Sequence, residues 1–192
     1  ADAIDQQRGL IKEANSRDLA LGRSNGLSAA MLDRLTLTDA RIGNMIKGIR
    51  DVALLPDPVG KKIWKCTRPN GLVIEKKRVP LGVIAIIYES RPNVTSDAAV
   101  LCIKTSNAVV LRGGKEAFHS NLAIARALQE GGAGAGLPNH ALQFIETLDR
   151  EAVRELVQLE NRVDVVIPRG GESLIRAVVE NARVPVLKHY KG

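Results

Sequence analysis

Apolar residues recur at steps of three and four residues over the first part of the chain, which is typical of helices with one buried face. The clearest example follows Thr38, a residue type that caps helix N-termini. Its apolar face comprises Ile42, Met45, Ile46, Ile49 and Val52. The Pro-Asp-Pro sequence at 56–58 is expected to end this helix. Two earlier helices are predicted near residues 1–22 and 28–35.

From residue 80 onward the pattern changes, and short β-branched runs alternate with helical patterns. Strands are predicted at Val83–Tyr88, Ala108–Leu111, Leu142–Ile145, Val163–Ile167 and Val184–Leu187. Helices are predicted near residues 95–104, 115–130, 149–159 and 171–181, with a flexible glycine-rich connection at 131–136. Strands separated by a helix run parallel and are joined by right-handed crossovers. The predicted fold class is therefore α/β, with a doubly wound parallel sheet.

Between these two regions, residues 61–79 are typical of a β-hairpin with its turn at 69–71. We therefore expect three parts. They are a helical segment (1–60), the hairpin, and an α/β domain (80–192) without an internal boundary.

The hairpin carries much of the positive charge, which is +7 for the whole chain. Its basic residues are Lys61, Lys62, Lys65, Arg68, Lys76, Lys77 and Arg78, against one acid, Glu75. A basic ribbon can bind nucleic-acid phosphates, but charged side chains also keep an exposed sheet edge from pairing with other strands. Single-strand binders stack bases on aromatic side chains, and here only Trp64 is present. We therefore expect no nucleic-acid partner.

Composition sets further limits on the class of protein. Aromatic residues make up only 3% of the chain, so aliphatic residues must form the core. No apolar run reaches the roughly 18 residues that span a bilayer, and the polar N-terminus lacks the order of a secretory signal. Cys66 and Cys102 give neither a disulfide framework nor metal-ligand spacing. We expect a cytoplasmic protein with no metal and no membrane association.

Two segments of the chain have similar sequences, and they give the main prediction about chemistry. Residues 109–116 read Val-Val-Leu-Arg-Gly-Gly-Lys-Glu, and residues 165–172 read Val-Val-Ile-Pro-Arg-Gly-Gly-Glu. Each combines a buried strand, an Arg-Gly-Gly turn and a helix start, at the edge where open α/β sheets bind ligands. Glycine lets a phosphate approach the backbone, the helix N-terminus favours the anion, and arginine adds a planar pair of donors. The alternative is that the glycines only permit tight turns.

These turns predict a set of cofactor-binding residues: Arg112, Gly113, Gly114, Lys115, Arg169, Gly170, Gly171 and Glu172. Many NAD-binding sheets carry an acid after the second strand, which binds the ribose hydroxyls. Here that position carries Arg112, with Lys115 nearby. Basic side chains at this position suit a 2′-phosphate, so NADP(H) is favoured over NAD(H).

The loop after the first predicted strand, at residues 88–95, is also a candidate part of the binding site. Pro92 restricts Arg91 to an extended conformation, so the strand does not continue. Thr95 or Ser96 is expected to cap the next helix. Asn93 could present an amide donor to a developing oxyanion, although an asparagine here could equally only form the turn.

Several stretches resemble a known family. PLGVIAIIYESRPNVTSDAAVLCIKTSNAVVLRGGKEAFHSN (80–121) and DVVIPRGGESLIRAVVENARVPV (164–186) closely resemble the γ-glutamyl phosphate reductase family, as do MLDRLTLT (31–38) and TRPNGL (67–72). The resemblance implies an aldehyde dehydrogenase-like fold, with N-terminal helices, a β-hairpin and a doubly wound parallel sheet. It also implies reduction of γ-glutamyl phosphate by NADPH to glutamate 5-semialdehyde and phosphate, in proline biosynthesis.

The resemblance also assigns roles to residues. Loop 89–93 matches the segment beside the nicotinamide, where Asn93 is the counterpart of an oxyanion-stabilising asparagine. The cofactor-contacting residues of this loop would be Glu89, Ser90, Arg91 and Pro92. Arg112 matches a lysine near the adenosine ribose, and 169–172 match the turn that contacts the pyrophosphate. The hairpin matches a region that joins subunits, which implies a homo-oligomer through residues 61–79.

The family's mechanism uses a cysteine that attacks the acyl phosphate and forms a thioester, which hydride from the nicotinamide then reduces. That cysteine lies downstream of the position matching Gly192. The catalytic-cysteine domain is therefore expected to be absent from this chain, and the chain alone to be inactive. Cys102, in an apolar helix, and Cys66, on the hairpin, are poor substitutes.

Other functions stay open at this point. The chain could be the reductase portion of a bifunctional pyrroline-5-carboxylate synthase, in which a kinase domain comes first. Glutamate 5-kinase is accordingly a candidate partner, beside the substrate γ-glutamyl phosphate. A nucleotide-binding module without chemistry of its own is another alternative, and a basic nucleic-acid binder is the last.

Overall fold

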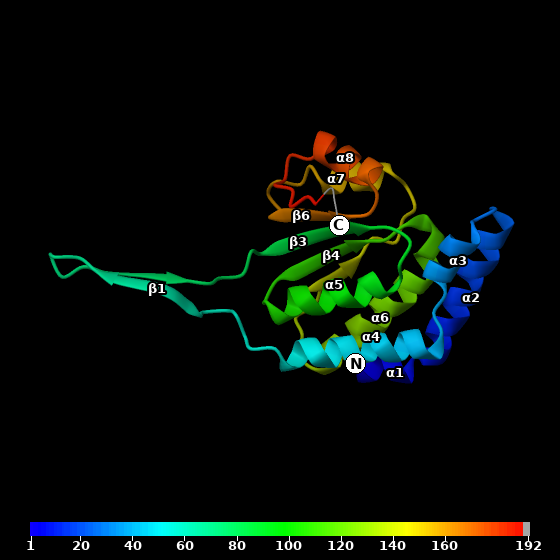
Figure 1. The fold of residues 1–192 in the computed structure, drawn as a ribbon, viewed down its shortest axis with the longest axis horizontal. Coiled ribbons are helices and arrows are strands. Elements are labelled where there is room, and N and C mark those ends of the chain that lie inside the picture. Colours follow the sequence, from blue (N-terminus) through cyan, green and yellow to red (C-terminus); the bar gives the residue numbers. More distant parts are fainter. Residues whose placement is uncertain (190–192) are drawn as a thin grey trace.

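The computed structural model describes residues 1–189, which form a central parallel sheet and a separate hairpin (Figure 1). The sheet has the strand order β5-β4-β3-β6, and all neighbouring strands run parallel. Its strands are β3 (Val83–Tyr88), β4 (Ala108–Arg112), β5 (Leu142–Phe144) and β6 (Val165–Arg169). Because β3, β4 and β6 run parallel, the loops that follow these strands all emerge at one edge.

Helices cover both faces of this sheet, α5 and α6 on one and α7 and α8 on the other (Figure 1). They are α5 (Asn93–Lys104), α6 (Phe118–Gly134), α7 (Glu151–Leu156) and α8 (Glu172–Asn181). Ile86 of β3 packs in one core with Ala99 of α5, whereas Ala85 and Ile87 pack in another with Val178 of α8. Alternate residues of β3 face opposite sides, so burial on both sides requires an apolar residue at every position. The predicted doubly wound sheet is confirmed.

An outer layer of N-terminal helices lies against α5 and α6 (Figure 1). These helices are α1 (Asp2–Gln6), α2 (Arg8–Ser24), α3 (Ala29–Leu35) and α4 (Asp39–Leu54). Ile4, Ile11 and Ile42 form a third apolar core with Ile124 of α6. The α/β unit therefore includes a helical layer on one side that the sheet itself does not touch.

The start of α4 confirms a prediction from local sequence. Thr38 lies just before the helix, and its Oγ1 accepts a hydrogen bond from the Arg41 backbone N–H at 3.2 Å. The helix ends at Leu54, ahead of the proline pair, as predicted. By contrast, the single helix predicted over 1–22 is wrong, because Gln7 separates α1 from α2.

The start of α5 differs from the prediction. The helix begins at Asn93, directly after Pro92, so Thr95 and Ser96 lie inside it and cannot cap it. Both are fully buried, and the Thr95 hydroxyl hydrogen-bonds to Tyr88 of β3. The Thr95 hydroxyl, which the sequence suggested as a helix cap, thus forms a tertiary hydrogen bond instead.

The glycine-rich stretch 131–136 is largely helical rather than a flexible connection, because α6 continues to Gly134. Gly131 lets α1 approach α6 closely, since a Cβ added there would lie 2.7 Å from the Cβ of Ala3. Gly136, at φ +83°, then reverses the chain in a left-handed conformation that glycine adopts without strain.

The strand predicted at Val184–Leu187 is reduced to an isolated bridge between Val166 and Val186. The Pro185 carbonyl accepts from the Val166 N–H, and the Leu187 N–H donates to the Val166 carbonyl, both at 2.9 Å. The segment therefore follows β6 in parallel. Proline has no N–H to extend such a ladder, which is the physical reason why no full strand forms here.

Residues 61–79 form the predicted hairpin of β1 (Lys62–Thr67) and β2 (Val73–Lys77), paired antiparallel. It projects away from the rest of the molecule (Figure 1). Gly71, at φ +85°, completes the turn. A two-stranded sheet of this kind buries little of its apolar surface, so most of its side chains stay exposed.

Asp18 joins α2 to the start of α6. Its Oδ2 accepts from the backbone N–H and hydroxyl of Ser120 at 2.7 and 2.6 Å, and its Oδ1 accepts from the His119 N–H at 3.1 Å. Asp18 is 1% exposed, and its burial raises the pKa of the carboxyl. Amides at a helix start lack partners within the helix, so Asp18 caps α6 from another part of the chain.

Replacing Asp18 with alanine should lower the free energy of unfolding by about 2–4 kcal/mol, because the buried amides of His119 and Ser120 lose their acceptor. Urea denaturation followed by circular dichroism measures this. Glu13→Ala on the exposed side of α2 removes only a surface pair with Arg17, so as a control it should cost less than about 0.5 kcal/mol. Equal losses in both variants would show that the Asp18 hydrogen bonds add no stability.

Candidate functional site

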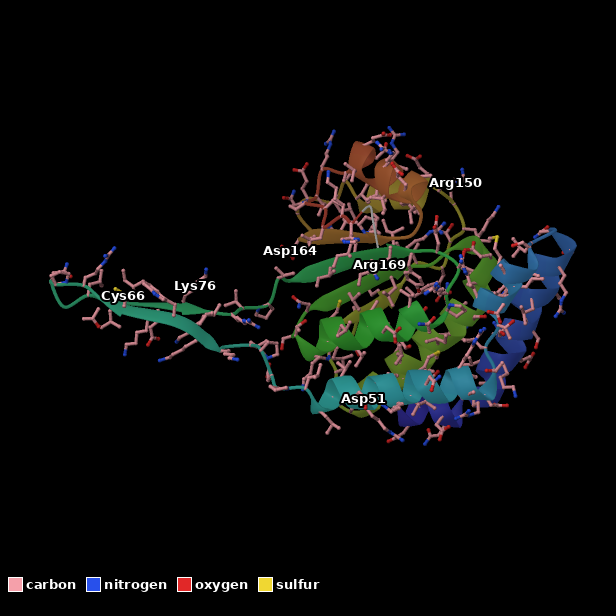
Figure 2. All side chains as sticks on the ribbon, in the orientation of Figure 1. Asp51, Cys66, Lys76, Arg150, Asp164 and Arg169 are labelled. Carbon is pink, nitrogen blue, oxygen red and sulfur yellow. The ribbon has the colours of Figure 1, made fainter. Side chains whose placement is uncertain are left out.

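The carboxyl edge of the sheet is the candidate site. The chain passes from β3 to β4 and β5 on one side, and then crosses back to place β6 on the other side of β3. Open α/β sheets bind ligands at such a switch point, outside the carboxyl ends of the strands. Figure 2 labels Arg169 at this end of β6 and Asp164 at the other end. The loops 89–92, 113–115 and 170–171 meet here.

The first loop contacts the second Arg-Gly-Gly turn directly. The Glu89 N–H donates to the Arg169 carbonyl at 3.2 Å, and the Glu89 Oε2 accepts from the Gly171 N–H at 2.8 Å. A Cβ added to Gly170 would lie 2.5 Å from the same carboxylate oxygen. The predicted anion position at the start of α8 is thus filled by a carboxylate from the chain itself.

The first loop also contacts the other Arg-Gly-Gly turn. The Ser90 N–H and hydroxyl both donate to Glu116 Oε1 at 2.7 Å. Ser90 has φ +45°, an uncommon conformation outside glycine, which this pair of hydrogen bonds holds in place. A Cβ added to Gly114 would lie 2.4 Å from Glu116. Glu116 is therefore part of the site, although the sequence pattern pointed only to its neighbour Lys115.

Arg112 ends β4 and is 8% exposed. Its Nη1 donates to the Gly113 carbonyl at 2.6 Å and its Nη2 to the Leu148 carbonyl at 3.2 Å, while its buried Nε has no partner among the described residues. Burial lowers the pKa of Arg112, whereas the nearby Glu116 carboxylate raises it and the nearby Arg150 lowers it. The guanidinium is a buried cation bonded to neutral carbonyls, and no carboxylate within residues 1–189 forms an ion pair with it.

A buried polar chain supports the Gly113 turn from beneath. The Tyr88 hydroxyl lies 2.7 Å from Thr95 Oγ1, which in turn donates to Asn121 Oδ1 at 3.1 Å. A Cβ added to Gly113 would lie 2.1 Å from Asn121 Nδ2, so only glycine fits here without displacing the asparagine. Because Tyr88, Thr95 and Asn121 come from β3, α5 and α6, this chain fixes the turn relative to three elements.

Asn93 is the first residue of α5 and is partly buried. Its Nδ2 donates to Asp97 Oδ2 at 2.9 Å, which orients the amide and leaves its second N–H for another acceptor. Asp97 is also partly buried, and burial raises the pKa of its carboxyl. Both residues line a pocket of about 420 Å³ together with Arg91.

The remaining predicted residues at this edge, Lys115, Glu172 and Arg169, are exposed and differ in their ion pairing. Lys115 is exposed at the start of the 3₁₀ turn η1 (Lys115–Ala117). Glu172 pairs with Arg176 along α8 at 2.6 Å and so faces solvent. Arg169 is exposed and forms no ion pair within the described residues. The structure thus brings the three loops together, whereas the ligand roles of their residues stay predictions.

Neither cysteine lies at this edge. Cys102 is buried between α5 and the sheet, and burial raises the pKa of its thiol to about 11. Cys66 lies on the projecting hairpin (Figure 2). Within residues 1–189 no three potential metal-ligating side chains gather, and no helix combines the length and apolar character needed to cross a membrane.

The comparisons with known proteins agree with this architecture. A family model described as the aldehyde dehydrogenase family matches residues 29–190. The chain belongs to the aldehyde dehydrogenase family. Among curated proteins, a γ-glutamyl phosphate reductase from Xanthomonas oryzae pv. oryzae (strain PXO99A) is 58% identical over 192 residues, which cover 100% of this chain and 46% of that protein.

Two solved structures of family members extend the match to the backbone. A γ-glutamyl phosphate reductase from Thermotoga maritima has a TM-score of 0.96 at 44% identity, covering 100% of this chain and 46% of that chain. The γ-glutamyl phosphate reductase from Saccharomyces cerevisiae has a TM-score of 0.87 at 34% identity, covering 100% and 49%. The resemblance inferred from the sequence is confirmed, and the chain spans about half the length of the curated relatives it matches.

Proposed function

We propose that this chain is the cofactor-binding part of an NADP(H)-dependent γ-glutamyl phosphate reductase, acting in the cytoplasm in proline biosynthesis. The reaction would convert γ-glutamyl phosphate and NADPH to glutamate 5-semialdehyde, phosphate and NADP. The observation that supports this most strongly is the 58% identity along the whole chain to a protein of that name. The meeting of three loops at the switch point of the sheet supports it independently.

The residues at the edge fit a nucleotide carrying phosphate groups. Arg112 is a buried cation that forms no ion pair within the described residues, and its desolvation costs free energy that a bound anion would offset. Gly113, Gly114 and Gly170 keep the backbone free of side chains. The Gly171 N–H already bonds to a carboxylate, so this helix start suits an anion; a diphosphate bound there would replace Glu89. When bound, the nicotinamide supplies the hydride.

Discrimination between NADP(H) and NAD(H) would rest on the end of β4. Arg112 and Lys115 lie there, and a 2′-phosphate would gain a charge-assisted hydrogen bond from the guanidinium. Glu116 Oε1 accepts hydrogen bonds from the Ser90 N–H and hydroxyl. These bonds make that oxygen less available to accept from the ribose hydroxyls of NAD(H). The pattern therefore favours the phosphorylated cofactor.

Replacing Arg112 with glutamine should weaken NADPH binding to the chain about tenfold to a hundredfold, because one charge-assisted bond to the 2′-phosphate is lost. NADH binding should change by less than about threefold, since NADH has no such group. Isothermal titration calorimetry measures both. Arg126→Gln, which removes only an exposed pair with Glu146, is the matched control. Equal weakening of both nucleotides would remove Arg112 from 2′-phosphate recognition.

The acyl-transfer step would use Asn93. Its side-chain N–H that is not bonded to Asp97 can donate to the oxygen that becomes negative as a thiolate attacks the γ-carbonyl. The thiolate itself would come from residues outside this chain, because Cys102 is buried and Cys66 lies on the hairpin. The chain alone would therefore bind nucleotide without turning over substrate.

In the complete reductase, Asn93→Ala should lower kcat about 10²-fold, because one oxyanion donor is lost. Steady-state assays with γ-glutamyl phosphate measure the loss. Asn25→Ala, an exposed amide at the end of α2 that does not line this pocket, serves as the comparison and should leave kcat within about threefold. An unchanged kcat for the Asn93 variant would exclude this oxyanion role.

The hairpin would join subunits. Trp64, Cys66 and Ile74 share one face of it with Lys76, the cross-strand neighbour of Trp64, and Trp64 is 52% exposed. On the other face Lys62, Lys65 and Lys77 surround Glu75, which offsets part of the basic charge. An isolated two-stranded hairpin is marginally stable, so a second copy of the chain covering the Trp64, Cys66 and Ile74 side chains would stabilise it.

Trp64→Lys should convert an oligomer of the chain to monomer, because a charge would then be buried in the subunit contact. Light scattering after size-exclusion chromatography reports the mass. Lys65→Gln, on the opposite face of the same strand, should leave the mass unchanged. If the tryptophan variant keeps the parent's mass, the hairpin does not hold the subunits together.

A further inference from the structure

The pocket in front of α5 combines parts of the chain that are far apart in sequence. It has a volume of about 420 Å³ and lies between the α3–α4 connection and the first turn of α5. Its polar and charged lining includes Asp33, Arg34, Arg41, Arg91, Asn93 and Asp97. Because Arg91 and Asn93 follow the carboxyl end of β3, the pocket adjoins the candidate cofactor edge.

The charges in this pocket divide into a paired and an unpaired set. Asp33 and Arg41 neutralise each other, with both carboxylate oxygens 3.0 Å from Arg41 Nη2. Asp97, in contrast, is partly buried and has only the Asn93 amide as a side-chain partner. Within residues 1–189 no cation pairs with it.

The arginines complete the unpaired set. Arg34 from α3 and Arg91 from the loop after β3 are exposed in the pocket, and neither guanidinium has a carboxylate partner within the described residues. A carboxylate that is partly removed from water is stabilised by a cation, and a guanidinium forms its strongest contacts with carboxylate or phosphate. The pocket therefore lacks one positive and at least one negative group.

We propose that this pocket binds the α-ammonium and α-carboxylate groups of an amino-acid substrate, with Asp97 on the ammonium and Arg34 on the carboxylate. The proposal rests on the function proposed above and adds the residues that recognise the glutamyl end. Asn93 connects the two functions, since one N–H of its amide bonds to Asp97 and the other is the donor proposed above for the reacting carbonyl. Arg91, two residues before Asn93, would then contact the phosphate group of the substrate.

Such a pocket would select against dicarboxylic acids that lack the amine. A ligand with no ammonium would leave Asp97 partly buried and unpaired, and a ligand with no α-carboxylate would leave Arg34 unpaired. Three probes separate these contributions: L-glutamate carries both groups, glutarate lacks the amine, and 4-aminobutyrate lacks the α-carboxylate. A substitution at Asp97 should therefore weaken binding of 4-aminobutyrate but not of glutarate. A substitution at Arg34 should weaken binding of glutarate but not of 4-aminobutyrate.

Nitrogen-15 NMR titration of the chain with these three compounds tests the proposal. L-Glutamate should shift the Asn93 side-chain amide saturably. Asp97→Asn should weaken L-glutamate about tenfold or more and leave glutarate within about threefold. Arg34→Gln should weaken L-glutamate and glutarate and spare 4-aminobutyrate. Asp51→Asn, an exposed residue of α4 outside the pocket (Figure 2), is the matched control.

Two results would overturn the proposal: no saturable shift at the Asn93 amide, or an equal loss of L-glutamate and glutarate in the Asp97 variant. Retained glutarate binding in that variant also shows that the pocket is still folded. Adding NADPH to the same samples keeps the two proposals apart, because it should shift the amides of Gly113 and Gly171. NADPH shifts without glutamate shifts would reject only the pocket, whereas the absence of both would also count against the proposed function.

Discussion

The parallel pairing of β3 with β4 on one side and β6 on the other is the constraint on which the site depends. Residue-by-residue register, with Ile87 beside Arg112 and Tyr88 beside Arg169, makes the strands end at the same level. The loops that follow can therefore touch. A shift of register by one residue would exchange the side chains of β3 between the two apolar cores. Because Ala85 and Ile86 differ in size and pack in different cores, side-chain packing fixes the edge geometry.

Carboxylates bind at this edge where the sequence pattern predicted phosphates. Glu89 accepts from the start of α8, and Glu116 accepts from Ser90. The two bonds show that the amides and glycines there form an anion-accepting surface. A diphosphate bound there, as proposed above, would have to displace an internal carboxylate. Its affinity would then reflect the difference in binding free energy between the two anions at that position.

The sequence could predict the features that depend on near neighbours. The Thr38 cap and the continuous apolar run of β3 need only local residues or burial on both faces. It could not predict that Ser90 bonds to Glu116, because their contact requires β3 and β4 to be paired first. The Asp97 pocket was missed for the same reason, since its other wall comes from α3 and α4.

Arg112 shows how a local flaw in the folded chain can favour a ligand. A buried donor without an acceptor costs about 1–3 kcal/mol, and the desolvation of the guanidinium adds to that cost. The free protein bears this cost, and a ligand oxygen bound at the guanidinium, as proposed above, would remove part of it. Affinity for a phosphate can therefore come partly from relief of an unfavourable arrangement that β4, the Gly113 turn and the Leu148 carbonyl hold in place.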